Sequence, residues 1–264
     1  MLFLVACAVV LASTSAAVRL FPGVSPALFI GFAASVGAFG LTMLFVWWDG
    51  LRLGDVGARF TRDSAQRLLV GLALGALLVA LHTGLVSLAG YTTWERVPPP
   101  RMSVVLITAV AFMLLACREE LAFHGYPLRR LVPTFGVWGA QAMIAFLFAL
   151  EHVAGGVPWR YALLGAGVGS LLFGMASIAT RGLAMPIGMH AAWNIGDWMR
   201  GGKGTGGLWR PVIRSGFADR SAGVDSALYI VVTVSATAAL WWWWRRTAGI
   251  RAVPAPASSE TGKR

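Results

Sequence analysis

Apolar residues occur along the chain in eight long runs, separated by short segments that hold most of the Arg, Pro and Gly. A run of about 20 apolar residues is long enough to cross a bilayer as a helix. Backbone groups inside lipid must be paired within the structure, and no alternating ten-residue pattern indicates a barrel. We therefore predict transmembrane helices at 2–20, 24–48, 67–90, 104–124, 135–153, 161–180, 183–199 and 225–244.

Composition supports an all-α polytopic membrane bundle of about eight helices. Hydrophobic residues make up 57% of the 264 residues and charged residues only 12%, whereas about a quarter of an average globular protein is charged. Residues 1–246 are predicted to form a single transmembrane bundle with its motif-bearing core at about 100–200, followed by a disordered cytoplasmic tail at 247–264. No basic segment precedes the first run, so we interpret it as a retained helix rather than a cleaved signal peptide.

The net charge of +11 does not indicate nucleic-acid binding, because Lys and Arg are spread through the loops. Basic loops are typical of membrane surfaces, and a slight excess of Lys and Arg on the side of the two termini predicts cytoplasmic termini. Arginine far outnumbers lysine, which is typical of a GC-rich bacterial genome. We expect an integral protein of the bacterial cytoplasmic (inner) membrane. Cys7 and Cys117 lie in apolar runs and indicate neither a disulfide nor a cysteine zinc cluster.

Two glycine pairs predict close helix packing, and one loop has two possible conformations. Gly71 and Gly75, and likewise Gly165 and Gly169, are four residues apart and follow no strand, so close helix packing is favoured over dinucleotide binding. The loop at 49–66 mixes apolar residues with Arg and Asp. Either a short helix in the membrane interface or a plain solvated loop is consistent with that mixture.

Few polar residues lie inside the predicted spans, and burying each of them in the bilayer costs free energy. A charge at bilayer depth costs about 2.5–3.5 kcal/mol on insertion scales and is normally retained for function. Most of these residues belong to three segments, "REELAFHG", "FALEH" and "MHAAWNIGD". The full set is His82, Arg118, Glu119, Glu120, His124, Glu151, His152, His190, Asn194 and Asp197.

Helical spacing predicts which of these side chains lie on a common face. Residues four apart are neighbours on a helix, which pairs Phe148 with His152, His190 with Asn194, and Glu120 with His124. Adjacent residues are about 100° apart. We therefore expect that Glu119 and Glu120 do not point to one spot, and that Glu119 faces a different neighbour.

One glutamate and two histidines from separate helices suit the activation of a water molecule. A base takes the proton, and hydrogen-bond donors stabilise the oxyanion that forms on an amide carbonyl. Two histidines and one carboxylate, here His152, His190 and Glu119, are also compatible with a zinc site. The chain has no H-E-x-x-H motif, and Phe148 stands where the inverted motif H-x-x-E-H needs its first histidine.

Taken together, the three segments resemble the CAAX-prenyl endopeptidase and bacteriocin-processing (CPBP) family of intramembrane proteases. The family pattern is E-E-x-x-x-R, then F-x-x-x-H, then H-x-x-x-N or D. The corresponding stretches are "EELAFH" from Glu119 to His124, "FALEH" from Phe148 to His152, and "HAAWN" from His190 to Asn194. Order, spacing and placement on separate spans agree, over roughly residues 100–200.

The resemblance implies hydrolysis of a peptide bond within the membrane. Glu119 with His152 would activate a water, and His190 with Asn194 would hold the developing oxyanion. Glu120 would orient the helix that carries the motif. The resemblance leaves open whether the mechanism uses zinc or a glutamate-activated water without metal. It implies as substrate a membrane-associated protein or peptide; a peptide precursor or another membrane protein is favoured over a prenylated target.

One position departs from the family pattern, because His124 stands where the pattern has arginine. Arginine is always charged, whereas histidine titrates near neutral pH. We hypothesise that a Glu120–His124 contact makes this protein sensitive to pH or marks a member that has lost catalysis.

Three of the polar residues also have purely structural interpretations, and two other functions are alternatives to the protease. His82 is interpreted as a hydrogen-bonded structural histidine, and Glu151 as a residue that approaches a helix interface. Asp197 either orients Asn194 or His190 or is solvated. A non-catalytic membrane scaffold or immunity-type protein would use the same helices without chemistry. A transporter would show an inverted repeat, which the polar motifs of the two halves do not support.

Overall fold

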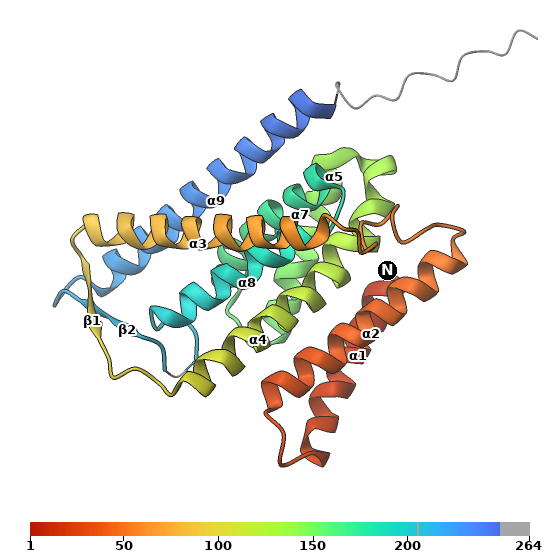
Figure 1. Ribbon diagram of the computed structural model, residues 1–264. Coiled ribbons are helices and arrows are strands. Elements are labelled where there is room, and N and C mark those ends of the chain that lie inside the picture. Colours follow the sequence, from red (N-terminus) through yellow and green to blue (C-terminus); the bar gives the residue numbers. More distant parts are fainter. Residues whose placement is uncertain (205, 249–264) are drawn as a thin grey trace, which may run out of the picture.

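The computed structural model describes residues 1–204 and 206–248, and these residues form an almost entirely helical bundle (Figure 1). The long helices are α1 (Leu2–Ala17), α2 (Pro26–Trp48), α3 (Ser64–Leu88), α4 (Met102–Glu119), α5 (Tyr126–Ala154), α7 (Val168–Thr180), α8 (Ala184–Met199) and α9 (Ala218–Ala248). The short elements are η1 (Val18–Leu20), the π-helical turns η2 (Glu120–Gly125) and η3 (Ala162–Gly167), α6 (Trp159–Tyr161), and the strands β1 (Thr92–Arg96) and β2 (Trp209–Ile213). The predicted all-α membrane bundle is confirmed, while the predicted tail lies outside the described residues from 249 onward.

Six helical segments of the described chain are long and apolar enough to cross a membrane. The structure has fewer such segments than the eight predicted spans, for two reasons. Met102–Ala154 counts as one segment of 53 residues although it contains two predicted spans, and α8 has only 16 residues. The long segment is broken at Gly136, whose φ of 67° and ψ of 175° are not helical. The boundary prediction at 125–134 was wrong, because these residues are helical and not a loop.

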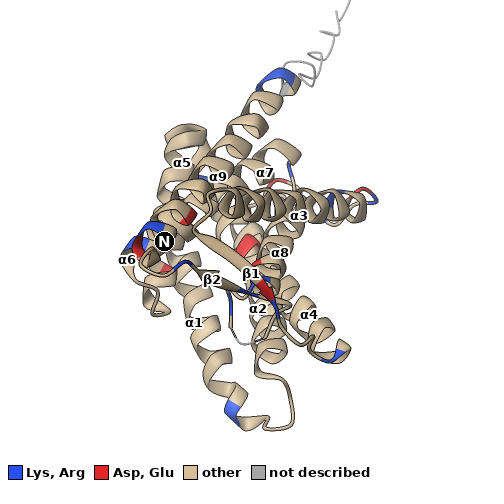
Figure 2. Cartoon of the chain, turned by 90° about the vertical axis from the view of Figure 1, so that its left-hand side faces the viewer, with Lys and Arg blue, Asp and Glu red and all other residues tan. Residues whose placement is uncertain are grey.

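The other predicted loop, at 49–66, forms turns up to the start of α3 and contains no helix of its own. The solvated-loop alternative is therefore the one observed. Charged residues lie mainly at helix ends and in connections, as Figure 2 shows for the face in view. This distribution is the one expected of a chain whose helices are surrounded by lipid.

Close packing of α3 against α8 explains the first glycine pair. A Cβ added at Gly71 would lie 2.1 Å from the carbonyl oxygen of Met185, and one at Gly75 would lie 2.4 Å from that of Met189. On the facing helix, a Cβ at Gly188 would lie 2.3 Å from the carbonyl oxygen of Leu68. Small residues that let helix backbones approach are a common packing device in membranes. The prediction for this pair is confirmed.

The second glycine pair follows the prediction only in part. A Cβ at Gly169 would lie 2.7 Å from the hydroxyl of Tyr229 on α9, whereas one at Gly165 would meet nothing within 4 Å. The Gly165 carbonyl instead accepts a hydrogen bond of 2.9 Å from that hydroxyl. One of these glycines therefore allows a close approach and the other does not.

A two-stranded antiparallel sheet was not predicted. Strand β1 pairs with β2 from Thr92↔Ile213 to Arg96↔Trp209, and Glu95 forms an ion pair with Arg210 across it. The two strands are far apart in sequence and are not joined by a short turn, so no local pattern predicts their pairing. The pair ties the connection between α3 and α4 to the connection between α8 and α9 (Figure 1).

Candidate functional site

Both motif glutamates reach the same histidine. Glu119 ends α4 and Glu120 begins the π-helical turn η2. Glu120 Oε1 lies 2.9 Å from His190 Nδ1, and Glu119 Oε2 lies 3.3 Å from His190 Nε2. The expectation that the two carboxylates face different neighbours was wrong. The two nitrogens of the imidazole lie at different positions of the ring. Two glutamates about 100° apart around the helix axis can therefore each approach one of them.

The predicted contact between Glu120 and His124 is present inside η2. His124 Nδ1 lies 2.7 Å from Glu120 Oε2, and its Nε2 lies 2.9 Å from Ser170 Oγ on α7. Both Glu120 and His124 are completely buried. Each oxygen of Glu120 thus faces a histidine nitrogen, which satisfies a carboxylate that water does not reach. π-Helical turns of this kind occur often at functional sites.

Arg118 is a residue whose role the sequence did not reveal. Its guanidinium donates a hydrogen bond of 2.6 Å to Glu119 Oε1 and another to Glu151 Oε1 on α5. Arg118 is 6% exposed and Glu119 5% exposed. A buried cation between two carboxylates compensates both charges. Glu151 therefore approaches a helix interface, as interpreted from the sequence, and there it binds Arg118.

His152 lies on α5 with its ring against Phe148, at a centroid distance of 4.6 Å. Its Nδ1 lies 2.9 Å from the carbonyl oxygen of Phe148. A carbonyl only accepts hydrogen bonds, so Nδ1 carries the proton in this contact. Nε2 is then the nitrogen with a free lone pair when the ring is neutral. This is the nitrogen that can accept a hydrogen bond from water.

His190 and Asn194 lie one turn apart on α8, as the spacing predicts. His190 stacks on Phe173 with ring centroids 4.4 Å apart and an interplanar angle of 11°. Asn194 Oδ1 accepts a hydrogen bond from the ammonium of Lys203, which follows α8 in the chain. Lys203 is a second residue whose role sequence reasoning missed, because it stands nine residues from Asn194 in a glycine-rich loop.

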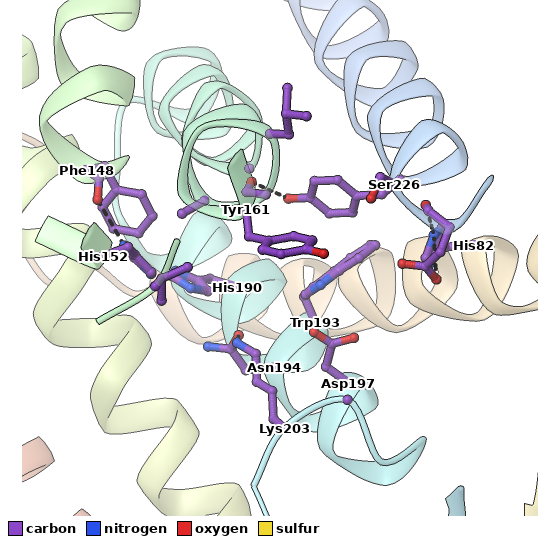
Figure 3. Close-up of a pocket in the computed structure, with 18 of the residues that line it drawn as sticks. His82, Phe148, His152, Tyr161, His190, Trp193, Asn194, Asp197, Lys203 and Ser226 are labelled. Carbon is purple, nitrogen blue, oxygen red and sulfur yellow. Dashed lines mark hydrogen bonds and ion pairs between the residues drawn. The ribbon is translucent and has the colours of Figure 1, made fainter. Parts of the chain in front are cut away.

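A cavity of about 420 Å³ brings these side chains together. His152, His190, Asn194 and Lys203 lie along one part of its wall, and His82 lies at the far end (Figure 3). Glu119 and Glu120 are not part of the wall; they lie behind His190, with which both are in contact. The structure thus brings the three motifs together, with the histidines and the asparagine at the cavity and the glutamates one layer deeper.

The far end of the cavity has a polar network of its own. His82 Nδ1 accepts a hydrogen bond of 2.9 Å from Arg200, and His82 Nε2 lies 3.1 Å from the carbonyl oxygen of Asp225. Arg200 also donates two hydrogen bonds to Asp197 Oδ1. His82 is therefore hydrogen-bonded and completely buried. Asp197 binds Arg200, which neither of the alternatives for it had included.

The proposed zinc ligands do not converge in this arrangement. Among residues 1–204 and 206–248, no group of three or more His, Cys, Asp or Glu side chains is placed to hold a metal ion. His190 directs both ring nitrogens at carboxylates, and Glu119 shares one oxygen with Arg118. These side chains are therefore bound to one another and are not arranged around a common metal position.

Fold and site together define a polytopic helical membrane protein with a buried glutamate–histidine centre beside a cavity. Residues 100–196 match the family model described as type II CAAX prenyl endopeptidase Rce1-like. This match confirms the resemblance predicted from the motifs, and it spans all three of them, from α4 to α8. No curated protein matches the chain. The part of the chain that carries the site is thus Rce1-like.

Proposed function

We propose that the protein is an intramembrane endopeptidase that hydrolyses a peptide bond in a membrane-associated protein or peptide with a water activated by Glu119. The observation that supports this most is the joining of three separate motifs. Two carboxylates meet one histidine, His190, at the wall of a cavity that His152 and Asn194 also line. In a scaffold protein, such a costly set of buried polar groups would have no evident use.

The chemistry begins with a water held between Glu119 and His152. The Glu119 carboxylate accepts a proton from the water, and His152 Nε2 accepts its second hydrogen bond and orients it. The hydroxide adds to the carbonyl carbon, and the electron pair of the C=O bond moves to the oxygen. Asn194 donates its amide N–H to this oxyanion. His190 Nε2 donates a second hydrogen bond with both ring nitrogens protonated, since Nδ1 already donates to Glu120. The proton on Glu119 then passes to the amide nitrogen as the C–N bond breaks.

Glu120 holds the side chain of His190 in place, and Arg118 holds that of Glu119. Glu120 binds His190 Nδ1 and His124 at once, so it fixes the ring whose other nitrogen faces Glu119. Arg118 binds Glu119 Oε1 and leaves Oε2 directed at the site. Positioning of this kind matters because small displacements of catalytic groups cost large factors in rate.

The substrate class follows from the family description only in outline. The matching family model is described as a CAAX prenyl endopeptidase, and the cavity of about 420 Å³ has room for a few side chains of a substrate. A peptide precursor or another membrane protein is the favoured substrate class in a bacterial membrane. The alternative function is a non-catalytic scaffold or immunity-type protein on the same helices.

A comparison of protein termini in membranes tests the proposed function. Membranes from cells that produce wild type are compared with membranes from cells that produce Glu119→Gln at the same level. We expect new N-termini and C-termini only with wild type, because glutamine is not a base. These termini also identify the cleavage site.

Glu95→Gln is the matched control, since it makes the same change on strand β1, where Glu95 is exposed and bound to Arg210. It should cleave like wild type. Identical termini from wild type and Glu119→Gln, with the cellular phenotype kept, would establish the scaffold alternative instead.

A further inference from the structure

Lys203 contacts Asn194, one of the two residues of the proposed oxyanion site. Its ammonium donates a hydrogen bond to Asn194 Oδ1, and it lies 5.9 Å from the ring centroid of Phe112 on α4. No carboxylate of the described residues lies within 4.0 Å of it. Arg200 on the same wall differs in this respect, since it is bound to Asp197, whereas Arg160 also has no ion pair among the described residues and lies over the Tyr161 ring. Lys203 is thus a positive charge at the cavity without an ion-pair partner in the described structure.

The contact decides which end of the Asn194 amide faces the cavity. An ammonium group only donates, so the amide oxygen and not its nitrogen must be turned toward Lys203. Nδ2, with two N–H donors, is then at the other end. Within residues 1–204 and 206–248 it has no hydrogen-bond partner, and Asn194 lines the cavity. Without Lys203, either end of the amide could face the cavity, and only one end can stabilise an oxyanion.

We propose that Lys203 is a positioning residue for the reaction, which turns the Asn194 amide so that Nδ2 donates to the oxyanion and adds a positive charge beside it. This inference rests on the proposed function. The ground-state carbonyl is neutral and the oxyanion is charged, so the effect belongs to the transition state. Loss of Lys203 should therefore lower kcat and leave KM nearly unchanged.

The composition of the chain allows a direct test of the contact. Asn194 is the only asparagine, and the only lysines are Lys203 and Lys263. Full-length protein in lipid vesicles, labelled with 15Nζ-lysine and 13Cγ-asparagine, gives one possible strong nitrogen–carbon dipolar coupling by solid-state NMR. We expect a coupling that corresponds to about 4 Å, the separation across one hydrogen bond. Lys203→Met should abolish it. Absence of the coupling in wild type would overturn the inference.

Kinetics then test the consequence, with a quenched-fluorescence peptide that spans the cleavage site found by the comparison of termini. Lys203→Met should lower kcat by about tenfold to a hundredfold, less than the loss of a whole oxyanion donor. Lys203→Arg should recover much of the activity, since it keeps a charged donor. In an Asn194→Ala background, Lys203→Met should have little further effect, because its main partner is absent.

The outcomes separate this inference from the proposed function. If wild type cleaves and Lys203→Met cleaves with the same kcat, Lys203 has no positioning role although the protein is a protease. If Lys203→Met lowers kcat equally with and without Asn194, it does not act through that residue. If wild type and Glu119→Gln give identical termini, the proposed function fails, and the catalytic role of Lys203 fails with it.

Discussion

At the scale of single residues, the buried charges are arranged in linked pairs that share partners. Arg118 donates hydrogen bonds to Glu119 and Glu151, and Glu120 accepts hydrogen bonds from His124 and His190. A charge in a low-dielectric interior is tolerated when it has such partners and is costly when one of them is removed. Each substitution in this network therefore affects the partner left behind as well as the residue replaced.

Arg118→Met should destabilise the protein by about 3–5 kcal/mol, because it leaves the buried Glu119 and the half-buried Glu151 without their cation. Thermal unfolding in detergent micelles measures the change. Arg210→Met is the control, since Arg210 forms its ion pair on the surface with Glu95, where such pairs contribute about 0–1 kcal/mol. Equal melting temperatures for the two variants would mean that the Arg118 pairs do not stabilise the fold.

His124→Arg should flatten the dependence of activity on pH between about pH 5 and 8. The substitution replaces an imidazole, the type of side chain that can change charge near neutral pH, with a guanidinium that stays charged and can still bind Glu120. The pH profiles of kcat for wild type and variant give the comparison. Glu95→Gln, which changes an exposed residue of strand β1 outside the site, should keep the profile of wild type. Superimposable profiles for His124→Arg and wild type would contradict the pH-sensitivity hypothesis.

At the scale of helices, α8 carries two of the site residues and is held by α3. Gly71, Gly75 and Gly188 bring the two backbones so close that a Cβ at any of them would overlap a carbonyl oxygen of the other helix. Met189, whose carbonyl contacts Gly75, directly precedes His190. The position of the site is therefore coupled to the packing of these two helices.

Gly75→Val should lower both activity and melting temperature, because the new side chain pushes α8 away from α3 and displaces His190 from the two glutamates. We expect at least a tenfold loss of kcat, since a misplacement of about 1 Å can cost a hundredfold. Gly84→Val is the matched control on the same helix, as a Cβ there meets nothing within 4 Å. A Gly75→Val variant as active as the control would show that α8 does not need this contact.

At the scale of the whole molecule, the site lies among helices from all parts of the Rce1-like segment, and other elements enclose it. Helix α9 contributes Tyr229 and Asp225 to the cavity wall, and α3 contributes His82, although both helices lie outside residues 100–196. The β1–β2 pair joins two connections at one end of the bundle (Figure 1). The cavity is thus a property of the complete bundle.

Thiol labelling of intact cells tests the predicted orientation of the bundle. Arg59 lies in the loop between α2 and α3, and Arg210 lies on β2. The predicted spans 67–90, 104–124, 135–153, 161–180 and 183–199 separate them, so the two residues should be on opposite sides. With cytoplasmic termini, an impermeant reagent should label Arg210→Cys and spare Arg59→Cys. The native thiols Cys7 and Cys117 are not exposed, and wild type gives their background. The reverse pattern would place the termini outside.

The sequence by itself determined the helical class, most of the apolar segments and the three motifs, although it did not predict that 125–134 is helical. These features depend on local patterns: the length of apolar runs, spacing by four, and the cost of charge in lipid. The Glu120–His124 contact was predictable for the same reason, since both residues lie within one helical turn. The family match over residues 100–196 agrees with motifs that could be read directly from the chain.

Only the tertiary structure decided how the site residues meet. That Glu119 and Glu120 share His190 and that Arg118 joins Glu119 to Glu151 depends on which helices lie side by side. The hydrogen bond from Lys203 to Asn194 depends on the path of the loop after α8. The pairing of β1 with β2 is of the same kind. Such contacts join residues of different elements, and their geometry is determined by helix packing and by the balance of buried charges, which no local pattern of residues specifies.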